Sequence, residues 1–186
     1  MRPAVFLDRD DTLIACRELP AAPPPCAPGD LIDPGLVRLL PGVLEGCRSL
    51  RRTGFALVVV SNQGVVARGG ATCAVVDRVN ARVGELLIDG AGRPLVERFY
   101  YCPFHPKGRV PEFTREHPWR KPAPGMILGA AEELGLDVSR SWLIGDAERD
   151  IAAGIGAGLT PERCVRVGEG VSFADAVQAV LAGRRA

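Results

Sequence analysis

Three aspartates and a threonine follow the first apolar run of the chain. The run is Ala4–Leu7, and Asp8, Asp10, Asp11 and Thr12 come directly after it. Because side chains alternate along an extended chain, Asp8 and Asp10 are expected on the same side. Carboxylates held that close need a cation, and Mg²⁺ prefers carboxylate oxygens together with phosphate oxygens of a substrate. The cluster therefore predicts a Mg²⁺ site, with a solvated acidic turn as the alternative.

Three further groups of polar residues lie downstream, each beside an apolar run. They are Ser61, Asn62, Gln63 and Gly64 after residues 55–60; Arg120 and Lys121 before residue 125; and Asp146 with Asp150 after residues 141–144. In open parallel sheets, ligands bind in the crevice at the carboxyl ends of the strands. We therefore expect all four groups to converge on one site.

These residue types are suited to phosphoryl transfer. Asp8 is placed to attack a phosphoryl group in line and form an aspartyl phosphate. Asp10 can protonate the leaving alcohol and later deprotonate the hydrolytic water. Ser61 and the backbone N–H of Asn62 offer hydrogen bonds to phosphate oxygens, and Lys121 supplies a positive charge.

The metal site is expected to draw on the same carboxylates. We predict that Asp8, Asp10 and Asp146 hold the Mg²⁺ ion. Asp150, one helical turn after Asp146, is expected to orient these ligands instead of binding the metal directly. Since neighbouring acids usually divide their roles, one of Asp8 and Asp10 should be ionised and the other should have a raised pKa.

The elements that must position these residues alternate between strands and helices. Strands are predicted at Ala4–Leu7, Ala56–Val60, Arg98–Tyr101, Trp142–Ile144 and Cys164–Val167. Helix-length segments separate them, which favours a mostly parallel sheet with helices on both faces. One predicted helix, Met126–Leu134, stops at Gly135 in a left-handed cap. The last helix is expected to start at Ser172, with Asp175 in its first turn.

The composition favours one domain, residues 1–186, because 186 residues with 47% hydrophobic content suit a single substantial core. A net charge of +1 with scattered basic residues gives no electrostatic signal for nucleic acid. No apolar stretch approaches about 18 residues, and Met1 runs directly into the first strand without a leader, so no membrane contact is expected. We expect a cytoplasmic monomer whose partner is a small phosphorylated metabolite.

The six cysteines and the two long loops add to this description. The cysteines contain no CxxC pair, and Cys47 and Cys73 are predicted to be small buried hydrophobes in a reduced compartment. The loops span residues 17–34 and 103–124. Loops of this length over the carboxyl edge of a sheet usually touch ligand, and a surface excursion without function is the alternative.

The order Asp-x-Asp-x-Thr, Ser-Asn, Lys-Pro and Gly-Asp with a trailing Asp resembles the haloacid dehalogenase (HAD) superfamily of phosphatases. The resemblance runs from Val5 to about Val167. Further stretches look like the subgroup that contains D-glycero-D-manno-heptose-1,7-bisphosphate 7-phosphatase and histidinol-phosphatase. These stretches are FLDRD at residues 6–10, LLPG at 39–42, VVSNQ at 59–63, YCP at 101–103 and RKPAPGM at 120–126.

The resemblance implies a Rossmann-like three-layer α/β sandwich. The sequence shows no large insertion after the first motif or after Ser61, so we expect no large cap domain. The resemblance also implies Mg²⁺-dependent hydrolysis of a small phosphorylated sugar, such as heptose 1,7-bisphosphate. The site residues that it implies are Asp8 as nucleophile, Asp10 as acid and base, Asp146 and the Asp10 carbonyl on Mg²⁺, and Arg120 as a substrate-binding residue beside phosphate-binding Lys121. We also predict that Asn62, Gln63 and Gly64 bind the substrate.

The chain departs from the subgroup pattern at two places. Asp11 replaces the usual glycine after the second aspartate, and we expect it to keep the left-handed turn. The subgroup also has a Cys-x-His and Cys-x-Cys zinc loop. Its four ligand positions here are Cys102, Phe104, His117 and Trp119, with His105 nearby. A closed zinc site needs four ligands, so we expect no structural zinc and a loop packed by its aromatic residues.

Several alternatives remain open at this point. Histidinol phosphate is a second possible substrate. A polynucleotide 3′-phosphatase resembles the chain in its Lys-Pro-x-x-Gly-Met stretch, although no basic surface is evident. A phospho-accepting receiver module also clusters acids, Ser or Thr and Lys on a parallel sheet. In receivers, however, the lysine follows the last acidic element, whereas Lys121 precedes Asp146.

Overall fold

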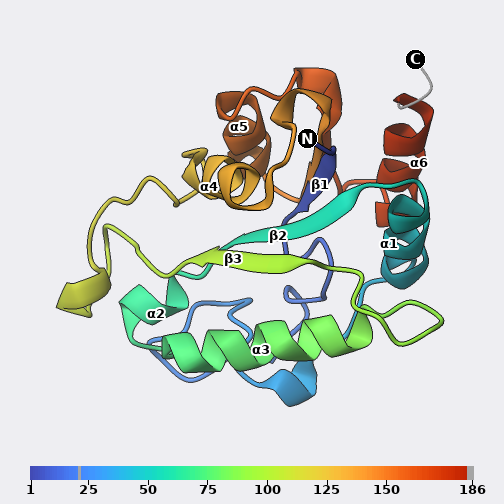
Figure 1. The fold of residues 1–186 in the computed structure, drawn as a ribbon. Coiled ribbons are helices and arrows are strands. Elements are labelled where there is room, and N and C mark those ends of the chain that lie inside the picture. Colours follow the sequence, from blue (N-terminus) through green and yellow to red (C-terminus); the bar gives the residue numbers. More distant parts are fainter. Residues whose placement is uncertain (21, 184–186) are drawn as a thin grey trace.

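Five parallel strands form one sheet at the centre of the protein (Figure 1). The computed structural model describes residues 1–20 and 22–183. The spatial order is β3-β2-β1-β4-β5, so β1 lies in the middle. The strands are β1 (Ala4–Leu7), β2 (Ala56–Asn62), β3 (Arg98–Cys102), β4 (Trp142–Gly145) and β5 (Cys164–Arg166). The α/β fold with a parallel sheet is confirmed.

Helices cover both faces of this sheet. They are α1 (Val43–Arg52), α2 (Val65–Arg68), α3 (Cys73–Leu86), α4 (Gly125–Leu134), α5 (Glu148–Gly156) and α6 (Phe173–Gly183). Side chains of α1, α3 and α6 share one hydrophobic core, and those of α4 and α5 share the other. In Figure 1, α4 and α5 lie above the sheet and α3 lies below it. The three layers match the predicted sandwich.

The central strand shows why the sequence folds in this way. Val5 and Leu7 belong to the core with α1, α3 and α6, while Ala4 and Phe6 belong to the core with α4 and α5. All four side chains are fully buried. A strand covered on both faces needs a continuous apolar run, and each large buried aliphatic or aromatic side chain contributes about 1.5–3 kcal/mol. This burial holds the carboxyl end of β1, and hence Asp8, in the middle of the edge.

The predicted boundaries differ from the structure by one or two residues. β2 includes Ser61 and Asn62, because these two residues pair with Tyr101 and Cys102 of β3. β3 and β4 also run one residue further than predicted, α4 begins one residue earlier, and β5 stops one residue earlier at Arg166. The differences in the strands follow from backbone pairing, which depends on neighbouring strands instead of the local sequence.

Two helix ends are confirmed, and one cysteine is corrected. Gly135 has a φ of 61° after α4, as expected for a left-handed cap. Ser172 caps α6 and exchanges hydrogen bonds with Asp175. Cys47 is buried as predicted, but Cys73 is only half-buried. It begins α3 and packs against a small surface cluster instead of the main core.

The long connection from β1 to α1 packs against the body of the domain. Its described residues contain only one short 3₁₀ helix, Pro34–Leu36, and no separate cap. Leu13, Ile14 and Leu31 are buried in the core shared with α1 and α3. No described helix is both long enough and apolar enough to cross a membrane.

Candidate active site

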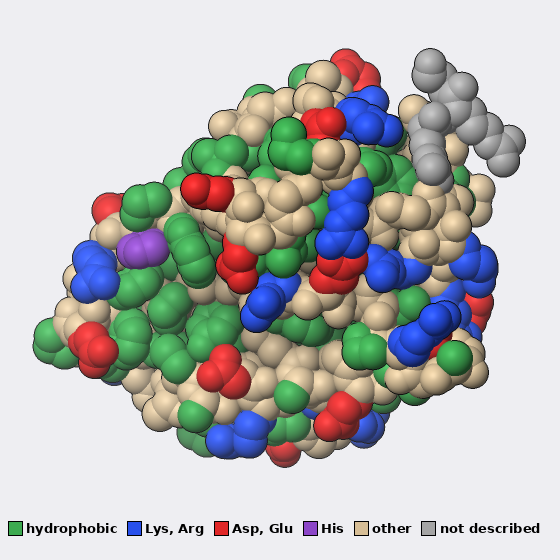
Figure 2. Space-filling view, viewed as in Figure 1, with side chains coloured by type: hydrophobic (Ala, Val, Ile, Leu, Met, Phe, Trp, Pro, Cys, Tyr) green, Lys and Arg blue, Asp and Glu red, His purple; other side chains and the backbone are tan. Residues whose placement is uncertain are grey.

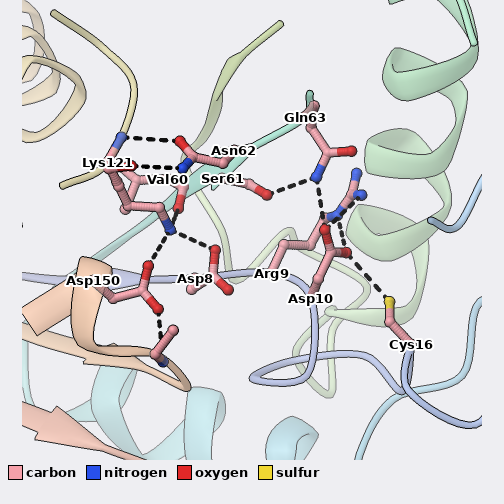
Figure 3. A network of polar contacts seen from close by, with 11 residues as sticks. Asp8, Arg9, Asp10, Cys16, Val60, Ser61, Asn62, Gln63, Lys121 and Asp150 are labelled. Carbon is pink, nitrogen blue, oxygen red and sulfur yellow. Dashed lines mark hydrogen bonds and ion pairs between the residues drawn. The ribbon is translucent and has the colours of Figure 1, made fainter. Parts of the chain in front are cut away.

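The four polar groups meet at the carboxyl edge of the sheet, where parallel strands end together. Asp8 directly follows β1, and its backbone N–H donates to Ile144 of β4 at 2.9 Å. Ser61 and Asn62 are the last two residues of β2, and Asp146 directly follows β4. Lys121 enters from the loop before α4 and reaches across to Asp8 (Figure 3).

Lys121 holds the centre of this site together. Its side chain is buried, and its ammonium donates to Asp8 Oδ1 at 2.6 Å and to the Val60 carbonyl at 2.7 Å. It also pairs with Asp150 Oδ1 at 2.7 Å. Burial alone would lower the pKa of Lys121, but Asp8 and Asp150 raise that pKa above its ordinary value. The lysine therefore stays charged beside the carboxylates.

Asn62 fixes the backbone of Lys121. The Asn62 amide nitrogen donates to the Lys121 carbonyl at 2.9 Å, and its amide oxygen accepts from the Lys121 N–H at 3.0 Å. This pair of hydrogen bonds ties the long loop to the end of β2 (Figure 3). The side chain of Asn62 is thus committed to the protein, and its backbone N–H is the group that could reach a substrate.

Three buried carboxylates form the most concentrated acidic group among the described residues. Asp8, Asp146 and Asp150 each offer an oxygen within 4.8 Å of the others. Burial raises the pKa of Asp8 to about 7, with Lys121 opposing the shift and Asp150 and Asp10 adding to it. Burial also raises the pKa of Asp146. The charged forms are therefore unfavourable without a further cation.

The oxygens of this group fit a divalent cation. Asp146 Oδ1 is buried and has no hydrogen-bond partner among the described residues, which is costly unless a ligand occupies it. Carboxylate oxygens are the donors that Mg²⁺ prefers. Asp150, expected to orient the ligands, lies inside the acidic group itself, where it binds Lys121 and accepts from the Ala147 N–H at 3.0 Å.

The loop after β1 brings the guanidinium group of Arg17 to the acidic group. Arg17 donates from Nη2 to Asp146 Oδ2 at 2.6 Å and pairs with Asp11 at 3.5 Å. Asp11 has a φ of 55°, the left-handed conformation expected from its position. Its Oδ1 accepts the backbone N–H groups of Cys16 and Arg17. Arg17 thus brings the start of the 17–34 loop to the acidic group, and the contact of this loop with a ligand stays a prediction.

Asp10 lies beside this acidic group but is held by other residues. Its carboxylate receives Arg9 Nε at 2.9 Å, Gln63 Nε2 at 2.7 Å and the Cys16 thiol at 3.4 Å. β1 ends at Leu7, so the strand alternation does not extend to Asp10. Burial would raise the pKa of Asp10, but Arg9 and the hydrogen bonds lower it. The two neighbouring acids thus have pKa values shifted in opposite directions.

The remaining predicted site residues surround these carboxylates. Ser61 Oγ accepts from Gln63 Nε2 at 2.8 Å. Gly64 begins the turn into α2, and a Cβ there would lie 3.4 Å from the Arg120 guanidinium. Arg120 also donates to the Phe104 carbonyl at 3.0 Å. The same Cβ would lie 3.1 Å from both Arg68 Nη1 and His105 Cδ2, so Gly64 leaves room for all three side chains.

Sequence reasoning missed three residues of this site. Arg9 and Asn80 lie buried behind Asp10, and Arg17 covers Asp146. A signal for Arg9 was present, because a charged residue at the end of a buried strand needs a partner. No local pattern indicated Asn80 or Arg17, since each meets its partner from a distant segment.

The loop of residues 103–124 is packed by aromatic rings. Phe104 stacks on His117 with centroids 4.2 Å apart and an interplanar angle of 14°, and Arg115 lies 4.1 Å from the Phe104 centroid. Trp119 meets Tyr100 edge to face at 6.0 Å. Figure 2 shows hydrophobic side chains gathered on the flank where this loop lies. These contacts hold the loop that carries Lys121.

A parallel sheet with a buried lysine and an acidic group at its carboxyl edge defines a phosphoryl-transfer enzyme of the α/β class. Comparisons with known proteins identify the family to which this enzyme belongs. A family profile described as HAD-hydrolase-like matches residues 118–184. The D-glycero-beta-D-manno-heptose-1,7-bisphosphate 7-phosphatase of Yersinia pestis is 33% identical over 180 residues, covering 91% of this chain and 84% of the relative. The same enzyme of Escherichia coli K12 is 34% identical over 177 residues, covering 91% and 82%.

Solved structures agree with these relatives. A putative HAD-like phosphatase from Mesorhizobium loti superimposes with a TM-score of 0.79 at 32% identity, covering 96% of this chain and 86% of that one. D,D-heptose 1,7-bisphosphate phosphatase from B. bronchiseptica, complexed with magnesium and phosphate, gives 0.75 at 22% identity, covering 97% and 99%. The chain therefore belongs to the HAD superfamily, in the family of the heptose-1,7-bisphosphate 7-phosphatases, and is a phosphoric monoester hydrolase.

The raised pKa of Asp8 predicts a stability effect in the metal-free protein. A carboxyl group with a pKa near 7 in the folded state binds a proton that the unfolded chain releases near pH 4. Its contribution to stability is present below about pH 4 and is lost as the pH rises through about 7. The stability of Asp8→Asn relative to wild type should therefore rise by about 2–3 kcal/mol when the pH is raised from 5 to 8. Unfolding in EDTA at both pH values measures this.

The exposed Asp33 provides the matched control, since Asp33→Asn removes a carboxylate that is not part of the acidic group. Its stability relative to wild type should change little between the same two pH values. A gain for Asp8→Asn that stays constant or shrinks at pH 8 would contradict the pKa assignment.

Proposed function

We propose that the protein is a Mg²⁺-dependent phosphatase that forms an aspartyl phosphate on Asp8 and acts on a small phosphorylated sugar. The observation that carries the proposal is the contact of a buried Lys121 with the buried Asp8, inside a group of carboxylates with an unpartnered oxygen. Asp8, Asp146 and the backbone carbonyl of Asp10 are the groups that would hold Mg²⁺. When bound, the ion neutralises the carboxylates and polarises the phosphoryl oxygens.

The side chains then divide the reaction between them. A carboxylate oxygen of Asp8 attacks phosphorus, and the bond from phosphorus to the leaving oxygen breaks. Asp10 gives its proton to that oxygen, and it later takes a proton from the water that hydrolyses the aspartyl phosphate. Lys121, the Ser61 hydroxyl and the Asn62 N–H stabilise the charge on the phosphoryl oxygens.

The sugar substrate is supported by the relatives and by the space beside the site. Both heptose-bisphosphate phosphatase relatives align over 91% of this chain. A cavity of about 360 Å³ lies next to Asp11, Thr12 and Arg17, which is within the range of small-molecule sites. Arg120 and Gly64, which lie near each other after β2, are also proposed to contact the substrate. We propose D-glycero-D-manno-heptose 1,7-bisphosphate as the substrate.

A phosphate-release assay with Mg²⁺ tests this proposal directly. Heptose 1,7-bisphosphate should release one phosphate, with kcat/KM at least about tenfold above histidinol phosphate and a 3′-phosphorylated oligonucleotide, since wrong leaving groups lose pocket contacts. Asp8→Asn should lower kcat by about three orders of magnitude or more because it removes the nucleophile. Preferential hydrolysis of histidinol phosphate would replace the proposed substrate, and an active Asp8→Asn would refute the covalent mechanism.

The acid role of Asp10 predicts a dependence on the leaving group. Asp10→Asn should slow hydrolysis of a sugar phosphate by about 10²-fold or more, since its alkoxide must be protonated as it leaves. It should slow hydrolysis of p-nitrophenyl phosphate far less, because that phenolate leaves without a proton. Equal losses in kcat for the two substrates would mean that Asp10 has another role.

The aromatic packing of residues 103–124 predicts that the loop holds no zinc. His105 Nδ1 accepts from the Lys107 N–H at 3.0 Å, and His117 Nδ1 accepts from the Trp119 N–H at 3.1 Å. The purified protein should contain no stoichiometric zinc, and activity lost to a chelator should return with Mg²⁺ alone. Phe104→Ala should lower stability by about 2 kcal/mol through lost ring contacts.

Elemental analysis and thermal unfolding measure both effects. Cys102→Ser is the matched control, because it removes a potential metal ligand but keeps the rings. A content of close to one zinc per chain, lost in Cys102→Ser, would contradict the prediction that the loop holds no zinc.

A further inference from the structure

Arg9 is a fully buried cation that the proposed reaction does not use. Its side chain has 0% exposed surface. Nε donates to Asp10 Oδ1 at 2.9 Å, Nη2 lies 3.3 Å from Asp10 Oδ2, and Nη1 donates to Asn80 Oδ1 at 2.7 Å. Figure 3 shows the guanidinium facing the Asp10 carboxylate. A charge removed from water in this way persists only when partners satisfy it, and these two partners do so.

Asn80 explains the orientation of the guanidinium. It lies on the inner face of α3, where Val76, Val79 and Val83 are buried beside it. A polar side chain on an apolar helix face is unfavourable unless it is hydrogen-bonded. Because the Asn80 amide oxygen accepts from Arg9 Nη1, the Nε and Nη2 atoms of the guanidinium face Asp10. In this way α3, which carries none of the proposed catalytic groups, reaches the acid.

Gln63 and Cys16 complete the setting of Asp10. Gln63 Nε2 donates to Asp10 Oδ2 at 2.7 Å, and the Cys16 thiol donates to Oδ1 at 3.4 Å. Both carboxylate oxygens are therefore held, each by more than one donor. Arg9 contacts both oxygens, so it limits the rotation of the Asp10 carboxylate and its exchange of a proton.

We propose that Arg9 and Asn80 are positioning residues for Asp10: Arg9 orients the carboxylate that exchanges the proton, and Asn80 orients Arg9. The inference rests on the acid and base role proposed for Asp10. Through Asn80, helix α3 would therefore help to position the acid for proton transfer, although it carries none of the proposed catalytic groups. Neither residue needs to touch the substrate.

Two substitutions at Asn80 test the inference without altering Arg9 or Asp10. Asn80→Asp has the same shape and adds a second carboxylate beside Arg9, which draws the positive charge away from Asp10. With the guanidinium drawn towards residue 80, this variant should slow heptose 1,7-bisphosphate by about threefold or more relative to p-nitrophenyl phosphate. Asn80→Leu leaves Arg9 Nη1 without its acceptor and frees the guanidinium to turn. It should slow heptose 1,7-bisphosphate about tenfold more than p-nitrophenyl phosphate.

Val83→Ala is the matched control, because Val83 is buried one turn further along the same face of α3. It should lower the unfolding temperature but leave the ratio of the kcat values for the two substrates unchanged. A merely structural role for Asn80 predicts this same result for its variants. Folded Asn80 variants that match Val83→Ala in this substrate ratio would overturn the inference. If Asn80→Leu fails to fold, the isosteric Asn80→Asp decides.

The Asp10→Asn variant separates this inference from the proposed function. If Asp10→Asn slows both substrates equally, the acid role of Asp10 fails, and the inference fails with it. If Asp10→Asn behaves as an acid variant while the Asn80 variants match wild type, only the positioning role of Arg9 and Asn80 fails.

Discussion

The buried ion pairs of Lys121 are the interaction on which the rest of the site depends. Lys121 comes from a loop, Asp8 from the end of β1 and Asp150 from the start of α5, so one ammonium group joins three separate segments. Breaking a buried pair by removing one partner typically costs about 3–5 kcal/mol, because the other charge stays buried without compensation. Movement of the loop away from the sheet would therefore break these ion pairs and incur that free-energy penalty. The precision of the site follows from this penalty as much as from the packing beneath it.

Asp8 and Asp10 show how two acids two residues apart obtain different properties. Burial and neighbouring carboxylates raise the pKa of Asp8, whereas Arg9 lowers the pKa of Asp10. The proposed reaction needs the reverse, an ionised nucleophile and a protonated acid. A divalent cation beside Asp8 would favour its ionised form, and a phosphate dianion beside Asp10 would favour its protonated form. The free protein is thus set to change its ionisation when its charged ligands arrive.

The sequence predicted what depends on local pattern and on the geometry of parallel sheets. The apolar runs predicted the five strands, and polar residues at the ends of β1, β2 and β4 were expected to meet because parallel strands end at one edge. The partners of those residues were not predictable in the same way. Asn80 reaches Arg9 from 71 positions away, and Arg17 reaches Asp146 from 129 positions away. Even the end of β2 at Asn62 depended on its pairing with β3. Such contacts arise from packing, and no periodicity in the chain records them.

The paired hydrogen bonds between Asn62 and the backbone of Lys121 have a consequence for how this family can diverge. They place Lys121 by its main chain, from a strand that lies outside the loop. Substitutions in the preceding residues, including those that stack Phe104 on His117, can therefore change how the loop is stabilised without moving the ammonium group. The arrangement separates the evolution of the loop from that of the chemistry. In this chain, the position of the reacting groups and the means of ordering the loop are therefore two separable properties.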